Sequence, residues 1–227
     1  MKIIRFQLKR LVVVIFIIIV LFALHSVWNN EKISFDCVMS TDTEKKLDNL
    51  LDEIQKALVD LKLTYFLCYN SLWGALKFKK SLPWHTELEL CVLNKELTAV
   101  DEGILNRIFK SHSLVIIYNS AGGFYKVNKF EENVPTATLT VFEEDQLTHQ
   151  MRRVGWIHRV LPPNSCEELN CFPPELISEP MPTIMFGTNK VPVPRDSIEI
   201  LKYLFPNSWW EDITPFHCRT STERQII

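Results

Sequence analysis

The chain has 227 residues and a formal net charge of −2 at pH 7. Four of its 25 Lys and Arg residues lie among the first ten, so residues 29–227 hold 21 basic against 27 acidic residues. This acidic balance leaves no basic patch for nucleic acid, and we expect no nucleic-acid partner. The 199 residues from Asn29 onward are enough for one well-packed domain but hardly for two.

The first 28 residues differ from the rest of the chain. Basic residues precede the apolar run LVVVIFIIIVLFALHSVW at residues 11–28. This length is within the usual range of about 17 to 25 residues for a membrane-spanning helix, and the cationic flank favours a cytoplasmic N-terminus. A cleaved signal peptide is the alternative, but the run is longer than a typical h-region and no A-x-A-like site follows it. We predict a cytoplasmic tail (1–10), a transmembrane signal anchor (11–28) and a lumenal domain (29–227).

The lumenal domain begins with a predicted helix, strand and second helix. Thr41 and Glu44 have the spacing of a capping box. Apolar side chains then recur at helical intervals, at Leu47, Leu50, Leu51, Ile54, Leu58 and Leu61. The aromatic segment LTYFLCY at residues 63–69 predicts a buried strand. Residues 70–80 start with the cap-type residues Asn70 and Ser71 and predict a short helix, which Pro83 ends.

The later segments alternate between strand and helix patterns. ELELCVL at residues 87–93 predicts a strand, followed by a helix from Lys95 to Lys110 with Asn94 as its cap. Residues 161–194 hold most of the 12 prolines and predict an ordered loop. Strand-like segments occupy residues 114–118, 123–127 and 137–142, and residues 196–205 predict a last helix. This mixture predicts a single α+β domain.

The chain has six cysteines, and a lumenal domain would be oxidised. Six cysteines permit fifteen pairings, and the sequence does not choose among them. Only Cys166 and Cys171 are close together, and their spacing of five fits no standard zinc motif. We therefore favour disulfides over a zinc site, with one or two free buried thiols such as Cys91.

Two glutamates on the predicted strand at residues 87–93 are the main candidates for chemistry. Because side chains at i and i+2 share a face of a strand, Glu87 and Glu89 project together. An isolated pair of this kind is usually a solvated edge face. Here, however, Ser71 begins a helix sixteen residues before Glu87, as in the nucleotidyltransferase layout. In that layout the helix N-terminus binds phosphate and the paired carboxylates bind Mg²⁺ or Mn²⁺.

Residues 65–93, YFLCYNSLWGALKFKKSLPWHTELELCVL, resemble the core motif of the LicD family, which includes bacterial phosphocholine transferases and animal fukutin-related proteins. Residues 171–210 are more weakly similar to the C-terminal part of fukutin-related protein. In the first segment Ser71 takes a Thr or Ser position and Lys77 takes the position of an arginine. The residues that match the motif directly are Leu72, Gly74, Pro83 and Trp84.

The resemblance implies a nucleotidyltransferase-like mixed sheet flanked by helices, preceded by one transmembrane helix. It also implies a type II protein of the Golgi or endoplasmic-reticulum membrane that moves a phospho-alditol or phosphocholine group from a CDP-linked donor to a glycan. In such an enzyme Glu87 and Glu89 would be the catalytic metal ligands for Mg²⁺ or Mn²⁺. Ser71 and its helix N-terminus would bind a donor phosphate, and Lys77 would neutralise another phosphate oxygen.

The sequence departs from the family pattern where charge matters most. His85 and Thr86 stand before the glutamates where the family has aspartates, and Asn70 replaces a motif glycine. The usual third aspartate falls at Thr140, although residues 143–145 include acids within reach from the next turn. These departures leave enzymatic activity open. They favour the alternative of a catalytically inactive relative that acts as a binding or accessory subunit, with a glycosyltransferase as a possible partner.

Other motifs permit two interpretations each. His85 is a ligand or proton carrier, or a partly exposed loop histidine. Trp209 and Trp210 are interpreted either as a platform that stacks on a sugar or as aromatic residues that close the core. The segment RRVGW, from Arg152 to Trp156, binds an anionic acceptor, or is a solvated turn.

Overall fold

The structure is a computed structural model that describes residues 15–16, 20, 37–130, 135–160, 165–211, 214–215 and 218. The chain divides into two compact units, Met1–Asp36 and Cys37–Ile227. In the first unit Ile15, Phe16 and Val20 are helical, and the rest of the predicted anchor lies outside the described residues. Within the described ranges, no helix is both long and apolar enough to cross a membrane.

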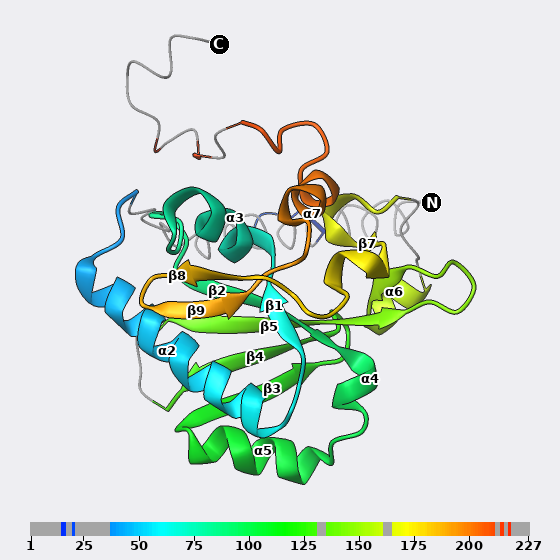
Figure 1. The fold of residues 1–227 in the computed structure, drawn as a ribbon, viewed down its shortest axis with the longest axis horizontal. Helices are drawn as coiled ribbons and strands as arrows, with labels where there is room; N and C mark the ends of the chain where they lie inside the picture. Colours follow the sequence, from blue (N-terminus) through cyan, green and yellow to red (C-terminus); the bar gives the residue numbers. More distant parts are fainter. Residues whose placement is uncertain are drawn as a thin grey trace, which may run out of the picture. The chain divides into compact units, whose positions relative to one another are not determined.

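The second unit contains a curled mixed sheet (Figure 1). Its main path runs in the order β1-β2-β5-β4-β3, and β6 pairs with both β5 and β7. The pairing of β2 with β5 is parallel, whereas the other pairs are antiparallel. The strands are β1 (Tyr65–Leu67), β2 (Glu87–Leu93), β3 (Leu114–Asn119), β4 (Phe124–Lys129), β5 (Thr136–Glu144), β6 (Met151–Arg153) and β7 (Cys171–Phe172).

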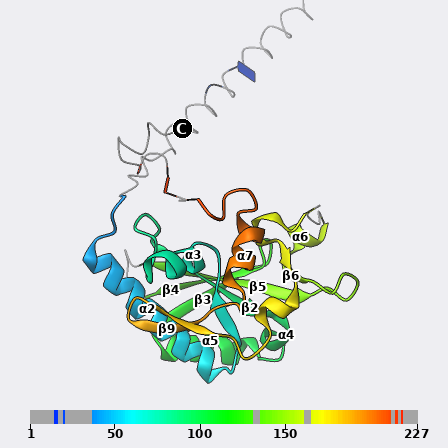
Figure 2. The ribbon, with the colours of Figure 1, turned by 45° about the horizontal axis from the view of Figure 1, so that its top comes forward.

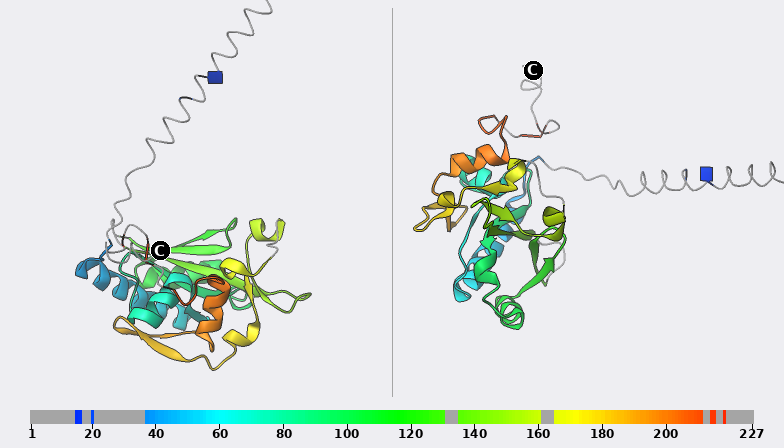
Figure 3. Two further views of the ribbon diagram at one scale, coloured as in Figure 1. Left: turned by 90° about the horizontal axis from the view of Figure 1, so that it is seen from above. Right: turned by 90° about the vertical axis from the view of Figure 1, so that its right-hand side faces the viewer.

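Helices cover both faces of this sheet, as predicted for an α+β domain. Helix α2 contacts β2 and β5 on one face and also contacts α5, whereas α3 packs on β2 from the other face beside α7 (Figures 1 and 3). The α-helices of this unit are α2 (Thr41–Asp60), α3 (Tyr69–Phe78), α4 (Asn94–Leu97), α5 (Glu102–Ser111), α6 (Trp156–Val160) and α7 (Ser197–Leu204).

A hairpin of β8 (Thr183–Phe186) and β9 (Asn189–Pro192) runs beside α2 (Figure 2). The Asn189 side chain donates to the Asp48 carbonyl at 3.0 Å, and the Gln55 side chain donates to the Lys190 carbonyl at 3.0 Å. With the 3₁₀ helices η1 (Glu167–Leu169) and η2 (Pro174–Ile177), this hairpin gives the segment predicted as loop several short ordered elements.

The first helix agrees with the periodic pattern but begins with a different cap. Five of the six predicted apolar positions are buried in the core, and Leu61 is partly buried after the last turn. The cap is Ser40, whose Oγ accepts from the Thr43 N–H at 3.1 Å, so the predicted capping-box role of Thr41 is wrong. A serine one position earlier has the extended backbone that an N-cap needs.

The predicted helix from Lys95 to Lys110 is instead two helices, α4 and α5. The chain breaks at Asp101, which has an extended backbone and accepts from the Gly103 and Ile104 N–H groups. Asp101 is therefore a new N-cap, and the apolar periodicity alone did not reveal it.

Three disulfides use all six cysteines. They join Cys37 to Cys218, Cys68 to Cys91, and Cys166 to Cys171. The preference for disulfides over zinc agrees with this pairing. The expectation that Cys91 is a free thiol is wrong, because β2 places it beside Cys68, the residue before α3.

Candidate functional site

The central strand pair presents Glu87 and Glu89 on the side of the sheet that α3 covers. As predicted, side chains alternate along β2, with Leu88 and Leu90 fully buried in the core. The side chains of Glu87 and Glu89 are 30% and 19% exposed. Both carboxylates therefore reach solvent while they are held from below by the sheet.

The start of α3 is hydrogen-bonded to Glu89. The Asn70 N–H donates to Glu89 Oε2 at 2.8 Å, and the Glu89 N–H donates to Ser71 Oγ at 2.8 Å. Below these contacts, the disulfide between Cys68 and Cys91 links the residue before α3 to the middle of β2. The Glu89 carboxylate thus occupies the N-terminus of α3, where a negative charge is stabilised by the helix dipole.

Glu87 has a cation and a hydroxyl as partners. Lys126 Nζ forms an ion pair with Glu87 Oε1, and Thr138 Oγ1 donates to the same oxygen. The sheet register explains both contacts, because Lys126 on β4 lies opposite Thr138 on β5, and Thr138 lies opposite Glu89 on β2. Lys126, Thr138 and the two glutamates are called the glutamate cluster below.

His85 is a further ionisable group near these carboxylates. Its Nε2 lies 3.4 Å from Glu89 Oε2, but the geometry is not that of a hydrogen bond, and this nitrogen is buried without another partner. The side chain as a whole is 26% exposed. His85 therefore lies at the edge of the glutamate cluster. It forms an ion pair with Glu89 only when its ring is protonated.

A comparison with protein-family models matches residues 62–196 to the family described as LicD/FKTN/FKRP, nucleotidyltransferase domain. The match covers more than half of the chain and includes β1, α3, β2 and β5. The chain belongs to the LicD family. A search of curated proteins found no match to the chain.

Gly74 shows why the LicD motif has a glycine inside a helix. A Cβ atom at Gly74 would lie 2.5 Å from the Lys80 carbonyl oxygen and 3.1 Å from the Leu82 nitrogen. The segment that leads back to β2 therefore packs against the helix backbone itself. This close approach sets the position of α3 over the two glutamates.

The two residues predicted to bind a donor phosphate lie at opposite ends of α3. Ser71 is 2% exposed, and its hydroxyl faces the β2 backbone through the bond from Glu89. Lys77 is exposed in the last turn, with Nζ 4.5 Å from the centroid of the Trp73 ring. Six residues of helix separate them by roughly 9 Å along the axis. Their phosphate-binding roles stay predictions.

The β5 residue beside Glu87 is not the one at which the LicD pattern predicts a third acid. Thr138, and not Thr140, is the β5 residue that contacts Glu87. Thr140 is 3% exposed and lies opposite Cys91, further from the open end of the strands. The acids suggested as substitutes have other partners, because Glu143 pairs with Arg159 and Asp145 pairs with Arg152.

The LicD family implies a divalent metal, and the side chains present do not fit one. Mg²⁺ and Mn²⁺ require several oxygen ligands with negative charge close together. Here one carboxylate already pairs with the Lys126 ammonium, the other accepts from Asn70, and Thr138 is neutral. Within the described part of the chain, no group of three or more His, Cys, Asp or Glu side chains is placed to hold a metal.

Sequence reasoning missed Lys126 and Thr138. Their strands were predicted, so each residue was known to point to one of two faces. The missing information was strand order, because β5 lies between β2 and β4 in the sheet although it follows both in the chain. Only this order brings Lys126 beside Glu87.

Pockets lie away from the glutamate cluster. One of about 330 Å³ lies between α7 and Cys166, and one of about 420 Å³ lies beside His112 and Lys129. A third, of about 230 Å³, is lined by Arg153 and its neighbours near α6. None of these three is lined by Glu87 or Glu89.

Proposed function

We propose that this chain is a LicD-family domain that has lost the metal-dependent transfer reaction and acts as a binding or accessory subunit in glycan modification. The observation that carries the proposal is the Lys126 ammonium bound to Glu87, with the Thr138 hydroxyl on the same oxygen. In this arrangement the protein itself supplies the positive charge that a metal would bring.

The ion pair is a poor starting point for metal binding. A divalent ion would have to displace Lys126 and would then find one free carboxylate edge and a neutral hydroxyl. Mg²⁺ loses its hydration water reluctantly and tolerates few misplaced ligands. The two glutamates thus form a satisfied internal network more readily than a metal centre.

The start of α3 supports the same proposal. A helix N-terminus attracts phosphate through its free N–H groups. At α3 the Asn70 N–H already donates to Glu89, and Ser71 is buried. The carboxylate expected to bind a metal is thus paired with Lys126, and the helix end expected to bind phosphate is paired with Glu89.

The proposed location is the Golgi or endoplasmic-reticulum membrane, with the domain in the lumen. Three disulfides support an oxidising compartment, in which such bonds persist. The apolar run at residues 11–28 supports a signal anchor. A glycosyltransferase is the proposed partner, and co-purification in mild detergent would support it. A strictly monomeric sample would weaken it.

Thermal melting of the full chain with CDP and Mn²⁺ tests the proposal. We expect no metal-dependent increase in Tm, because the site's charges are already satisfied. An occupied site at 100 times its dissociation constant would add about 2.7 kcal/mol, which a melting curve resolves. A metal-dependent increase that Glu87→Gln abolishes, and that the exposed control Glu144→Gln keeps, would overturn the proposal.

A second candidate is active transfer of a phospho-alditol or phosphocholine group from a CDP-linked donor to a glycan. The observation that favours it is the retained layout, with Glu87 and Glu89 on one face beside the start of α3. This candidate requires turnover of a CDP-linked donor that Glu87→Gln removes. Equal turnover in wild type and variant, at the level of the buffer, would exclude it.

A further inference from the structure

The pocket of about 230 Å³ near α6 is separate from the glutamate cluster. It lies where the end of β5, strand β6 and helix α6 meet. Its lining residues are Glu143, Asp145, Arg152, Arg153, His158 and Arg159. These six ionisable residues are called the arginine pocket below.

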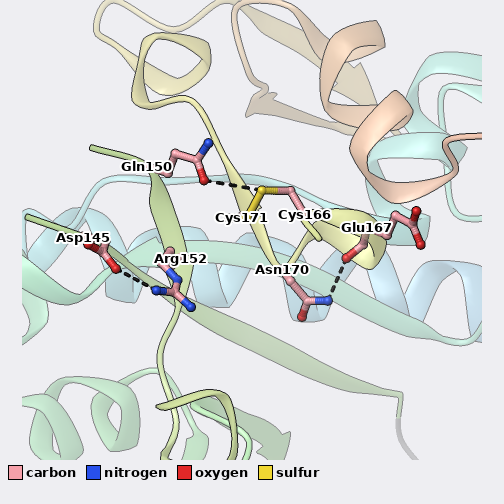
Figure 4. Close-up of a disulfide and its surroundings, with 7 residues drawn as sticks. All are labelled: Asp145, Gln150, Arg152, Cys166, Glu167, Asn170 and Cys171. Carbon is pink, nitrogen blue, oxygen red and sulfur yellow. Dashed lines mark hydrogen bonds and ion pairs between the residues drawn. A yellow bond between two sulfur atoms is a disulfide. The ribbon is translucent and has the colours of Figure 1, made fainter. Parts of the chain in front are cut away.

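Both acids of the arginine pocket have an arginine partner. Asp145 Oδ2 accepts from Arg152 Nη1 at 2.7 Å (Figure 4), and Glu143 Oε1 accepts from Arg159 Nη2 at 2.8 Å. The Arg152 guanidinium and the Thr148 and Leu147 N–H groups lower the pKa of Asp145 to about 2. Both acids are therefore committed to pairs at neutral pH.

Arg153 is the positive charge that these pairs leave over. Among the described residues it has no acidic partner, and its Nε is buried without a hydrogen bond. Its guanidinium carbon lies 5.9 Å from the centroid of the Tyr69 ring. Burial raises the pKa of Tyr69 to about 12, so the phenol stays neutral and does not act as the counter-ion. A buried donor without an acceptor is energetically unfavourable, and a bound anion would supply that acceptor.

His158 reports the same excess of positive charge. Burial, and then the charge of Arg153, lower the pKa of His158. Three arginines against two acids leave one net positive charge when His158 is neutral, and protonation of His158 adds a second. A phosphate monoester carries about −1.5 to −2 at neutral pH, which complements this charge.

We infer that the arginine pocket binds a phosphoryl group, with Arg153 as its principal ligand. The guanidinium fork offers paired N–H donors that match the oxygens of a phosphate. The neighbouring Arg152 and Arg159 keep their acids and frame the anion by charge. The segment RRVGW, which lies inside the family match but outside the motif at residues 65–93, thus contributes a binding residue of its own.

Two chemical forms of ligand, a phosphorylated sugar and a nucleotide, contain this phosphoryl group. Isothermal titration of the full chain with inorganic phosphate, glucose 6-phosphate and CDP, in EDTA, separates them. We expect saturable binding of at least one probe, and the tightest probe identifies the form. EDTA removes any contribution from the glutamate cluster, so failure here is distinct from failure of the proposed function.

Arg153→Gln should weaken binding about ten- to a hundredfold, as loss of a charged hydrogen bond does. The exposed Arg107→Gln on α5 makes the same charge change away from the pocket and should leave affinity unchanged. Arg153→Lys retains the charge without the fork and should fall between them, which keeps the test valid if Arg153→Gln folds poorly.

Because protonated His158 adds a positive charge, wild type should gain affinity relative to His158→Asn as the pH falls from 7.5 to 6. Comparing the two proteins cancels the protonation of the phosphate probe itself, whose second pKa is about 6. The other charged groups that line the pocket with this histidine are Arg152, Arg153, Arg159, Glu143 and Asp145. An equal ratio of wild-type to His158→Asn affinity at pH 7.5 and pH 6 would contradict this role of His158. Absence of saturable binding at millimolar concentrations of every probe, or equal binding by wild type and Arg153→Gln, would overturn the inference.

Discussion

The glutamate cluster and the arginine pocket handle charge in opposite ways. In the glutamate cluster, Glu87 has Lys126 and Thr138 as partners and Glu89 has the start of α3. In the arginine pocket, two ion pairs leave Arg153 with a buried donor and no acceptor. The carboxylates of Glu87 and Glu89 thus have partners within the chain, whereas Arg153, which lies inside the family match but outside the motif at residues 65–93, leaves a donor unpaired.

The disulfides near the two regions should contribute differently to the free energy of unfolding. The bond between Cys68 and Cys91 spans 23 residues and lies under the glutamate cluster, whereas the bond between Cys166 and Cys171 spans 5 and flanks β6. Loop-closure entropy predicts a loss of about 3 kcal/mol for Cys68→Ala with Cys91→Ala, and about 2 kcal/mol for Cys166→Ala with Cys171→Ala. Urea unfolding measures both, and a reversed order would show that the glutamate cluster is not the more firmly fixed region.

The buried hydroxyl under the glutamate cluster should be structural. Ser71→Ala leaves the Glu89 N–H without an acceptor, which should cost about 1 to 3 kcal/mol. Ser111→Ala on exposed α5 is the matched control and should change the free energy of unfolding by less than about 0.5 kcal/mol. If both variants change the free energy of unfolding by equally small amounts, the Ser71 hydroxyl has no structural role and is available to a ligand.

Removal of one cation should destabilise the glutamate cluster but not the arginine pocket. Lys126→Met keeps the apolar stem but leaves Glu87 without its ion pair, which should cost about 0.5 to 1 kcal/mol at this exposure. Arg153→Met removes an uncompensated buried donor and should be neutral or stabilising in phosphate-free buffer. Chemical denaturation of both variants provides the check. Equal destabilisation would mean that Arg153 has a stabilising partner in the folded chain.

The smallest effect concerns His158. Its pKa is lowered in the folded chain by burial and Arg153, so the unfolded chain binds a proton first as the pH falls through the usual value near 6.5. Stability should therefore decrease below that pH, and His158→Asn should lessen the decrease. The exposed His149→Asn is the control and should retain it. Denaturation at pH 7.5 and 5.5 measures this, and identical pH dependence in wild type and His158→Asn would contradict the assignment.

Periodicity predicted the elements, but not the contacts that decide the site. Strand β2 was predicted with its observed ends, and alternation correctly placed Glu87 and Glu89 together. Lys126 follows Glu87 by 39 residues and reaches it across β5, which lies between β2 and β4. Similarly, RRVGW is recognisable in the sequence as a basic segment. The structure distinguishes its two arginines, because Arg152 forms an ion pair with Asp145 and Arg153 does not. Local patterns fix faces of strands, whereas partners across a sheet depend on strand order.

We propose that Lys126 and Thr138 occupy the places where a metal centre would need open carboxylates. Direct Mn²⁺ binding by the full chain, measured by electron paramagnetic resonance, tests it with wild type and with Lys126→Ala combined with Thr138→Asp. We predict no saturable binding by wild type, and binding by the double variant, which frees Glu87 and supplies a further carboxylate. Mn²⁺ binding by wild type that Glu87→Gln abolishes would contradict the account and restore the glutamates as a metal site.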